Sequence, residues 1–394
     1  MSKPAPSAAV PKVAAIACGG TGGHLFPGLA VGRELRQRGC AVTLLVSSKE
    51  IDRQAAAAAG DMEVLRLPAV GLSRGNVPGF LWRFWQSYRL SINHFKRRPP
   101  ALVLAMGGFT AAPPILAGKR LGALTFLHES NSIPGRANRW LARLVDGAFV
   151  YFGAARDRLR ARRVEVTGMP VREEFLRLPP SAGARAALGL KAGAPVLLVM
   201  GGSQGAHQIN ELIVGILPQL LKAAPPLQFV HLTGQADLEK VRSAYAARRC
   251  PAVVKAFLAE MAPALAAADL AVSRAGASSL AEYAACGLPA ILIPYPSAAD
   301  NHQYYNALAF ARGGAARALA ADTLSPELLT QEILTLLGDP ARRSAMREAL
   351  RAWHAPGAAA AIAERMLHWN ALPGLLPRPV VAGANEPKLG MLNV

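Results

Sequence analysis

Two stretches of this chain share one order of features: an apolar run, a cluster of glycines and a helix-forming segment. The first is KVAAIAC followed by GGTGGHLFPGLA, over residues 12–30, and the second is APVLLVM followed by GGSQGAHQIN, over 194–210. A short apolar run is typical of a buried strand, and glycines let a backbone approach a ligand closely. The repeat predicts two nucleotide-binding-like halves, each beginning strand, glycine loop, helix.

The rest of each half alternates between apolar runs and helical segments. Further strands are predicted at 41–46, 101–106, 123–130 and 147–151, and then at 227–234, 252–257, 269–276 and 288–296. Strands that alternate with helices favour parallel α/β sheets. Because ligands bind at the carboxyl ends of such strands, one half can hold a nucleotide donor and the other an acceptor.

The glycine loops are phosphate-binding candidates, since a glycine turn into a helix exposes N–H groups and the positive end of the helix dipole. The first loop is not GxGxxG and lacks the Lys-Ser/Thr pair of a P-loop, so a dinucleotide or ATP site is disfavoured. Pro27 is predicted in the first turn of the helix that follows. The segment 166–190 is predicted to join the halves, and 371–394, rich in Pro and Gly, to form a flexible tail.

Composition narrows the class of partner. The net charge of +19 predicts either attraction to polyanions or only a surface that keeps the protein in solution. No basic stripe is interleaved with aromatic residues, so no nucleic acid is expected. The four cysteines form no CxxC pair, and no uncharged apolar run reaches the ~18 residues of a membrane span. We therefore expect a soluble or peripheral protein of a reducing compartment.

Seven motifs follow one another in the order found in a known family. They are GGTGGHLFPGLA, MGGFTAAPP, HESN, GMPVR, GGSQGAHQIN, SRAGASSLAEYAACGLPAILIPYP and DNHQYYNA. Together they resemble the MurG family of glycosyltransferases, from about residue 12 to about 368. One departure is Ser130, where the family often has glutamine.

The resemblance implies a GT-B fold, with two Rossmann-like domains facing each other across a deep cleft. The first domain would span 1–172, completed by a C-terminal helix within about 354–370, and the second would span 173–353. It also implies an inverting enzyme that transfers N-acetylglucosamine (GlcNAc) from UDP-GlcNAc to the 4-hydroxyl of the MurNAc sugar in lipid I, forming lipid II of peptidoglycan. The implied location is the cytoplasmic face of the bacterial inner membrane, as a peripheral protein. The implied partners are UDP-GlcNAc, lipid I, an anionic membrane surface and other cell-wall synthesis enzymes.

Such a transfer must stabilise charge on the departing diphosphate, which many glycosyltransferases do with a metal held by a DxD motif. This chain contains no DxD motif. Helix N-termini, hydroxyl groups and arginine can meet the same charge. We therefore expect an enzyme that needs neither metal nor cofactor, with UDP-GlcNAc as donor substrate.

The resemblance places donor contacts in the second half and at the join. The implied diphosphate contacts are Arg172, Ser203, Gln204 and Gly205, and Ala277 would offer an N–H group at a helix start. Backbone groups near Leu258 would read uracil, with Met261 as a further donor contact close by. Glu282 would accept from the ribose hydroxyls, and His302 and Gln303 would read the GlcNAc hydroxyls. From the residues alone, a capping serine, a surface ion pair, a solvated helix carboxylate and ordinary core packing remain open for these positions.

The acceptor side is implied in the first half. His24 is a candidate base, because histidine titrates near neutral pH, or it is a structural hydrogen-bonding group. Glu129 could be the base or could orient His24. The residues expected to line the acceptor pocket are Thr21, Gly22, Gly23, Gly108 and Asn131.

A helix over 79–100 is the candidate membrane surface. On a helical wheel one face gathers Leu81, Phe84, Trp85, Tyr88, Ile92 and Phe95, and this face is predicted to enter the core. Phe80 and Trp82 fall outside it and would meet lipid, with Arg83 and Arg89 near anionic headgroups. A basic rim on an ordinary surface helix is the alternative.

Three other functions remain open from the sequence. The chain could use another lipid acceptor, such as diacylglycerol, or could be a UDP-GlcNAc epimerase. It could also be a catalytically silent scaffold that binds sugar nucleotides. HESN and DNHQYYNA argue against the first two, and the occupied polar positions argue against the third.

Overall fold

The structure is a computed structural model that describes residues 13–47, 59–71, 76–202 and 205–371. The chain divides into two compact units. Unit 1 contains the chain up to Arg172 together with the segment that begins at Ala355, and unit 2 runs from Glu173 to His354. Two predicted site residues, Ser203 and Gln204, and the predicted tail from residue 372 onward lie outside the described residues.

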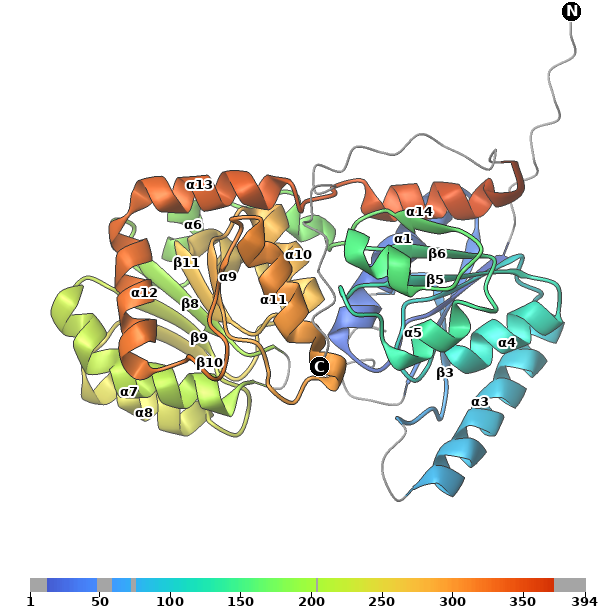
Figure 1. Cartoon of the computed structure of the whole chain (residues 1–394), viewed down its shortest axis with the longest axis horizontal. Helices are drawn as coiled ribbons and strands as arrows, with labels where there is room; N and C mark the ends of the chain where they lie inside the picture. Colours follow the sequence, from blue (N-terminus) through green and yellow to red (C-terminus); the bar gives the residue numbers. More distant parts are fainter. Residues whose placement is uncertain (1–12, 48–58, 72–75, 203–204, 372–394) are drawn as a thin grey trace, which may run out of the picture. The chain divides into compact units, whose positions relative to one another are not determined.

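Unit 1 is built on a parallel sheet (Figure 1). Among its described residues seven strands lie in the order β3-β2-β1-β4-β5-β6-β7. The strands are β1 (Val13–Ala17), β2 (Ala41–Val46), β3 (Glu63–Arg66), β4 (Leu102–Ala105), β5 (Leu124–Glu129), β6 (Gly147–Val150) and β7 (Val164–Val166). The helices are α1 (Gly22–Gln37), α3 (Val77–Arg97), α4 (Ala112–Arg120), α5 (Arg136–Leu141) and α14 (Ala358–Leu367), with short 3₁₀ turns η1 (Gly153–Arg158) and η4 (Trp369–Ala371).

The five strands predicted in the first half are all present. Every residue of β4 is buried, as expected for strands of a parallel sheet covered on both faces. β3 and β7 escape prediction because EVLR and VEV are short and mix charged with apolar residues.

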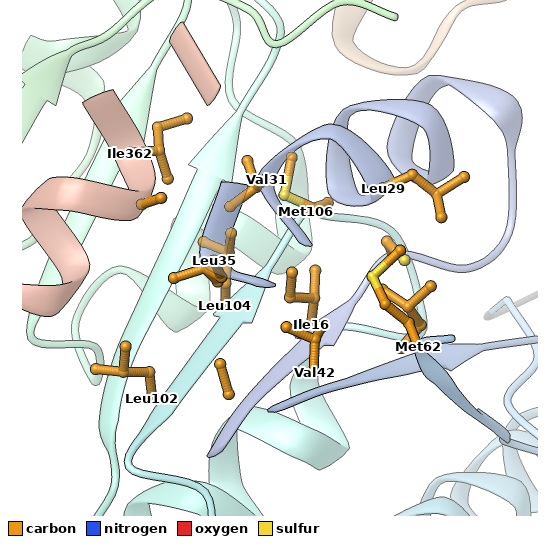
Figure 2. Packing of buried hydrophobic residues seen from close by; sticks show 14 of the residues in the cluster. Ile16, Leu29, Val31, Leu35, Val42, Met62, Leu102, Leu104, Met106 and Ile362 are labelled. Carbon is orange, nitrogen blue, oxygen red and sulfur yellow. The ribbon is translucent and has the colours of Figure 1, made fainter. Parts of the chain in front are cut away.

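The C-terminal helix α14 belongs to unit 1. Its residues Ile362 and Met366 are buried in the same apolar cluster as Leu35 of α1 (Figure 2). Beyond the helix, the Trp369 ring stands edge-on to Phe126, with ring centroids 5.0 Å apart. Burial of these apolar side chains holds the end of the described chain on the sheet formed by its beginning.

Helix α3 corrects one prediction. Leu81 and Trp85 do not enter the core: they are 58% and 43% exposed. The buried residues of α3 are Ser87, Ser91 and Phe95, all in its second half. That half packs on α4, whereas the first half projects away from the rest of unit 1 (Figure 1). The first turns of the helix therefore have no core to enter, whatever their periodicity.

Unit 2 repeats the architecture. Its sheet has the order β10-β9-β8-β11-β12-β13, again with all described neighbours parallel. The strands are β8 (Val196–Met200), β9 (Gln228–Leu232), β10 (Ala252–Lys255), β11 (Leu270–Ser273), β12 (Ala290–Leu292) and β13 (Arg317–Ala318). The helices are α6 (Ser181–Ala187), α7 (His207–Ala223), α8 (Leu238–Ala247), α9 (Ala262–Ala267), α10 (Ala277–Cys286), α11 (His302–Arg312), α12 (Pro326–Gly338) and α13 (Pro340–Arg351), with 3₁₀ turns η2 (Glu173–Phe175) and η3 (Ala299–Asn301).

The two sheets share a topology that places the glycine loops. In each sheet the first three strands lie on one side, in the order β3-β2-β1 or β10-β9-β8. The chain then returns to the middle of the sheet, so that β4 lies beside β1 and β11 lies beside β8. The strand order reverses at these pairs, which is where ligands bind in open α/β sheets. Each glycine loop follows the first strand of such a pair, β1 in unit 1 and β8 in unit 2. The predicted pair of nucleotide-binding-like halves is confirmed.

Candidate functional site

In unit 1, the loop after β4 supports the loop after β1. The hydroxyl of Thr110 donates a hydrogen bond of 2.9 Å to the carbonyl oxygen of Gly19. The His24 imidazole lies against the backbone of Gly107 and Gly108, where an added Cβ would come within 3.1 Å of a ring carbon. Both glycines have a positive φ, of 105° and 76°, which side chains disfavour. The MGG motif thus provides bare backbone on which the imidazole packs.

His24 lies in the first turn of α1. Thr21 is extended, and its carbonyl accepts from the N–H groups of His24 and of the residue after it, at 3.1 and 3.2 Å. Gly22 and Gly23 are the first two residues of the helix. The sequence predicts Pro27 in the first turn of the helix, and this is wrong. Because α1 already begins at Gly22, Pro27 lies in its second turn.

Glu129 ends β5 and is 2% exposed. One carboxylate oxygen accepts from the backbone N–H and the side-chain amide of Asn131, at 2.8 and 3.2 Å. The other accepts from the Gly135 N–H and from Asn138 Nδ2, both at 2.9 Å. Burial raises the pKa of this carboxyl group, and the four hydrogen bonds act in the opposite direction. The carboxylate therefore organises the whole loop from HESN to α5.

Sequence reasoning misses Asn138, which binds Glu129 and lies beside Gly107. Its Nδ2 also donates to the His128 carbonyl at 3.1 Å and lies 3.4 Å from where a Cβ on Gly107 would be. The same glycine contacts the ring of His24. The one sequence signal is an asparagine in the helix that follows HESN.

His128 lies on β5, and Arg172 is the last residue of unit 1 before the chain enters unit 2. His128 is fully buried, and its Nε2 is 3.1 Å from the Gly168 carbonyl oxygen. Burial lowers the pKa of His128 to about 4, so it is neutral at pH 7 and donates from Nε2. The Arg172 guanidinium carbon lies 4.5 Å from the centroid of the Phe26 ring on α1. Arg172, a predicted donor residue, thus belongs to the unit that carries the predicted acceptor residues.

In unit 2, the second glycine loop lies directly on the turn after β9. Gly205 has a φ of 75°, and a Cβ there would come 2.3 Å from the Thr233 carbonyl oxygen. Ala206 precedes α7 in an extended conformation. Only glycine fits this contact, so the loop and the β9 turn are tightly coupled.

A buried arginine in the loop after β11 connects the segment after β12 to the start of α7. Arg274 is 8% exposed, and its guanidinium donates to the carbonyl oxygens of Ile293 and Pro294 at 3.1 and 3.2 Å. It also donates to Gln208 Oε1 of α7 at 3.3 Å and lies 5.3 Å from the ring centroid of Tyr295. Arg274 lies in the SRAG motif, but no local sequence pattern marks its role, because its partners are far away in the chain.

The turn before α11 is left-handed. Asp300 and Asn301 both have a φ of 51°, a conformation that Asp and Asn adopt more readily than other non-glycine residues. His302 Nδ1 lies 2.8 Å from the Ala299 carbonyl oxygen. Gln303 Oε1 accepts from the Tyr295 N–H at 3.0 Å. Gln303 is thereby placed beside the segment that Arg274 holds.

The remaining predicted donor residues lie after other strands of the same sheet. Leu258 is half-buried in the loop after β10, and Met261 is buried just before α9. Ala277 begins α10, and Glu282 is half-buried on that helix. Among the described residues, no cluster of histidine, cysteine and acidic groups could hold a metal ion. None of the described helices combines the length and apolar character needed to cross a bilayer.

Models of one protein family match both units. The model described as the glycosyltransferase family 28 N-terminal domain matches residues 14–150, and the model of the C-terminal domain of that family matches residues 196–364. The chain belongs to glycosyltransferase family 28. Its two parallel-sheet units are accordingly the two Rossmann-like domains of a GT-B fold, which confirms the predicted fold class.

Relatives of this family 28 chain match it over nearly their whole length. A Geobacter metallireducens protein is 38% identical over 89% of this chain and 97% of its own; it is named UDP-N-acetylglucosamine--N-acetylmuramyl-(pentapeptide) pyrophosphoryl-undecaprenol N-acetylglucosamine transferase. A Geobacter sulfurreducens protein with the same name is 39% identical over 89% and 97%. The crystal structure of Acinetobacter baumannii MurG matches with a TM-score of 0.68 and 28% identity, over 90% of this chain and 98% of that one.

Structural likeness also extends to another class of enzyme. A putative UDP-N-acetylglucosamine 2-epimerase from Listeria monocytogenes matches with a TM-score of 0.70 over 92% of this chain and 98% of that one. The identity is only 13%, so this match shows the fold alone. The family 28 chain therefore shares its architecture with epimerases and its sequence with the transferases.

Proposed function

We propose that this protein transfers GlcNAc from UDP-GlcNAc to the 4-hydroxyl of the MurNAc sugar in lipid I, the undecaprenyl diphosphate-linked MurNAc-pentapeptide, and so forms lipid II. The observation that carries the proposal is the similarity of the whole chain to transferases named for this reaction. Both glycine loops and the motifs around them are present in the described fold, apart from Ser203 and Gln204. An acceptor half and a donor half are thus both available.

The reaction needs a general base and groups that stabilise the charge on the departing diphosphate. The acceptor oxygen attacks the anomeric carbon of GlcNAc, its proton passes to the base, and the bond to the phosphate oxygen breaks with inversion as UDP leaves. We assign the base to His24. Support comes from its position at the start of α1 and its packing on Gly107 and Gly108, which fixes the plane of the imidazole. Histidine exchanges protons near neutral pH, as a general base must.

Glu129 is assigned a positioning role. Its two oxygens accept four hydrogen bonds from Asn131, Gly135 and Asn138, so proton transfer to it would disturb the loop that it organises. The acceptor would lie along Thr21, Gly22, Gly23, Gly108 and Asn131.

The donor is assigned to the carboxyl edge of the unit 2 sheet. The diphosphate would meet Ser203, Gln204 and Gly205 of the glycine loop that precedes α7, with Ala277 and Arg172, because helix N-termini and guanidinium groups stabilise phosphate charge. Glu282 would accept from the ribose hydroxyls, Leu258 and Met261 would contact uracil, and His302 and Gln303 would read the GlcNAc hydroxyls. With these groups meeting the charge, we propose that no metal or cofactor is required.

Turnover tests this proposal. The protein is incubated with UDP-GlcNAc and a short-chain lipid I analogue in the presence of EDTA, and UDP release is measured. We expect release that needs both substrates and persists in EDTA. UDP binding without turnover would instead indicate a silent sugar-nucleotide-binding protein. Loss of activity in EDTA would contradict metal independence.

We further propose that α3 carries the protein onto an anionic membrane, as a peripheral protein of the cytoplasmic face. Trp82 is 56% exposed, and its ring stacks on that of Trp85 at 5.1 Å. The Arg89 guanidinium carbon lies 4.7 Å from the centroid of the Trp85 ring, and Arg83 is also exposed. Exposed tryptophans with neighbouring arginines suit a membrane interface, where rings enter the headgroup region and cations meet anionic lipid.

Vesicle sedimentation tests the membrane surface. We expect the double variant Phe80→Ser, Trp82→Ser to bind vesicles with anionic lipid several-fold less than the wild type, since each ring loses apolar burial. UDP binding should not change. The matched control is Leu176→Ser, which removes a side chain of unit 2 that is 40% exposed. Equal sedimentation of the double variant and the wild type would refute the assignment of α3.

A further inference from the structure

A set of buried polar side chains lies beneath the second glycine loop, outside the groups assigned to the reaction. His231 on β9 is fully buried, with Nδ1 3.1 Å from the Tyr245 hydroxyl oxygen and Nε2 3.0 Å from Asn210 Oδ1. Burial lowers the pKa of His231 to about 3 and raises the pKa of Tyr245 well above its ordinary value, so both are neutral at pH 7. Because Asn210 Oδ1 can only accept, Nε2 donates to it and the tyrosine hydroxyl donates to Nδ1.

Asn210 connects His231 to the glycine loop. With Oδ1 bound to His231, its Nδ2 donates to the Thr233 carbonyl oxygen at 2.9 Å and to Asp237 Oδ2 at 2.7 Å. The Thr233 carbonyl oxygen is also the atom that leaves no room for a Cβ at Gly205. One carbonyl therefore accepts the asparagine hydrogen bond and supports the backbone of the glycine loop.

The other end of the set reaches solvent between α7 and α8, which pack together (Figure 1). Asp237 Oδ1 lies 2.9 Å from Nδ1 of His207, the first residue of α7. Partial burial acts to raise the pKa of Asp237, but the hydrogen bonds from Asn210 and His207 lower it by more. The pKa of Asp237 is therefore below its ordinary value. Asp237 is therefore an ionised acceptor that binds α7 at two positions, one helical turn apart.

We propose that Tyr245, His231 and Asp237 are positioning residues for the sugar-nucleotide donor. Acting through Asn210, they fix the backbone of the glycine loop at Gly205 and thereby set the affinity for the diphosphate of a nucleotide. This inference rests on the proposed function, which places the donor diphosphate at this loop. Glycines have no side chains that could hold such a loop by packing, whereas hydrogen bonds of fixed direction beneath it can hold its backbone at Gly205.

Calorimetric titration of the full chain with UDP and with uridine tests the inference, with a melting temperature for each variant. We expect the Kd for UDP to rise about tenfold in His231→Leu and about threefold in Tyr245→Phe. A loop that is held less firmly would lose part of a hydrogen bond to the charged diphosphate. The affinity for uridine, which has no phosphate, should not change. In turnover, the KM for the donor should rise while the KM for the acceptor stays constant.

The matched control is Gln228→Leu, at the opposite end of β9. Gln228 is equally buried and makes two hydrogen bonds to the Lys191 backbone, at 2.8 and 2.9 Å, away from the glycine loop. It should lower the melting temperature and leave UDP binding intact. An equal loss of UDP affinity in this control would mean that general destabilisation is responsible, which overturns the inference.

Two further outcomes separate the inference from the proposed function. Failure of the wild type to bind UDP would refute the proposed function itself. A wild type that binds UDP, with Tyr245→Phe and His231→Leu binding it equally well, would overturn the inference alone. If His231→Leu does not fold, Tyr245→Phe decides, because it removes a single hydroxyl and keeps the ring.

Discussion

The two glycine loops follow strands of equivalent position, yet they are held in different ways. In unit 1 the loop is held by the Thr110 hydroxyl, and the histidine that follows it packs on bare glycine backbone. In unit 2 the loop lies on a neighbouring turn that buried side chains hold from beneath. The first arrangement presents a side chain that can move a proton. The second fixes the backbone at Gly205, just before the start of α7, and a helix N-terminus suits an anion.

Removing the imidazole should have the largest effect. We expect His24→Ala to lower kcat by about 10²- to 10⁴-fold, the usual contribution of a general base, with an unchanged Kd for UDP. Steady-state turnover and calorimetry measure the two quantities. His368→Ala, which removes an exposed histidine of the same unit, is the control. A near-normal rate in His24→Ala would leave this histidine a structural group.

Adding a methyl group to one loop at a time should distinguish the roles of the two loops. In Gly108→Ala the Cβ would come within 3.1 Å of the His24 ring, and in Gly205→Ala within 2.3 Å of a carbonyl oxygen. We expect about a tenfold loss of kcat in the first and about a tenfold loss of UDP affinity in the second, from strain of ~1–3 kcal/mol.

Gly215→Ala serves as the control for both loop variants. Gly215 lies on α7 with no atom within 4 Å of an added Cβ, so the change should leave kinetics intact and slightly favour the helix. If Gly108→Ala weakened UDP binding as much as Gly205→Ala, the assignment of one substrate to each loop would be wrong.

Replacing the buried carboxylate should affect stability more than chemistry. Glu129→Gln places an amide NH₂ among four donors, so we expect a loss of ~1–3 kcal/mol in the free energy of unfolding. Denaturant titration measures this loss. The fall in kcat should be smaller than in His24→Ala; a larger fall would favour Glu129 as the base.

Mild acid should destabilise both units through their buried histidines. Burial lowers the pKa of His128 to about 4 and of His231 to about 3, from 6.5. Below pH 6.5 the unfolded chain therefore binds more protons than the folded one. Each histidine should remove about 1.4 kcal/mol of stability per pH unit, down to about pH 4 in unit 1 and about pH 3 in unit 2.

Denaturation midpoints at pH 7 and pH 5.5 test this dependence. His128→Gln should flatten the pH dependence of the unit 1 transition, and His231→Gln that of unit 2. Slopes that are unaffected by either change would show that other groups cause the acid sensitivity.

Local patterns in the sequence determined the framework of this protein. Apolar runs predicted the central strands and the glycine clusters predicted both loops, because burial of a short strand and freedom of the backbone depend on neighbouring residues. The motifs also indicated the family. These signals lie within a few residues of one another, so a single chain displays them.

Only the tertiary structure decided which side chains support the site. These side chains make contacts between residues far apart in the chain: Asn138 beside Gly107, Arg274 between the segment after β12 and α7, and His231 with Asn210 of α7. The exposed face of α3 also depended on where the helix leaves its partner α4, which periodicity does not encode. Packing directions arise from the whole fold, so the sequence determined the loops and the folded chain determined what holds them.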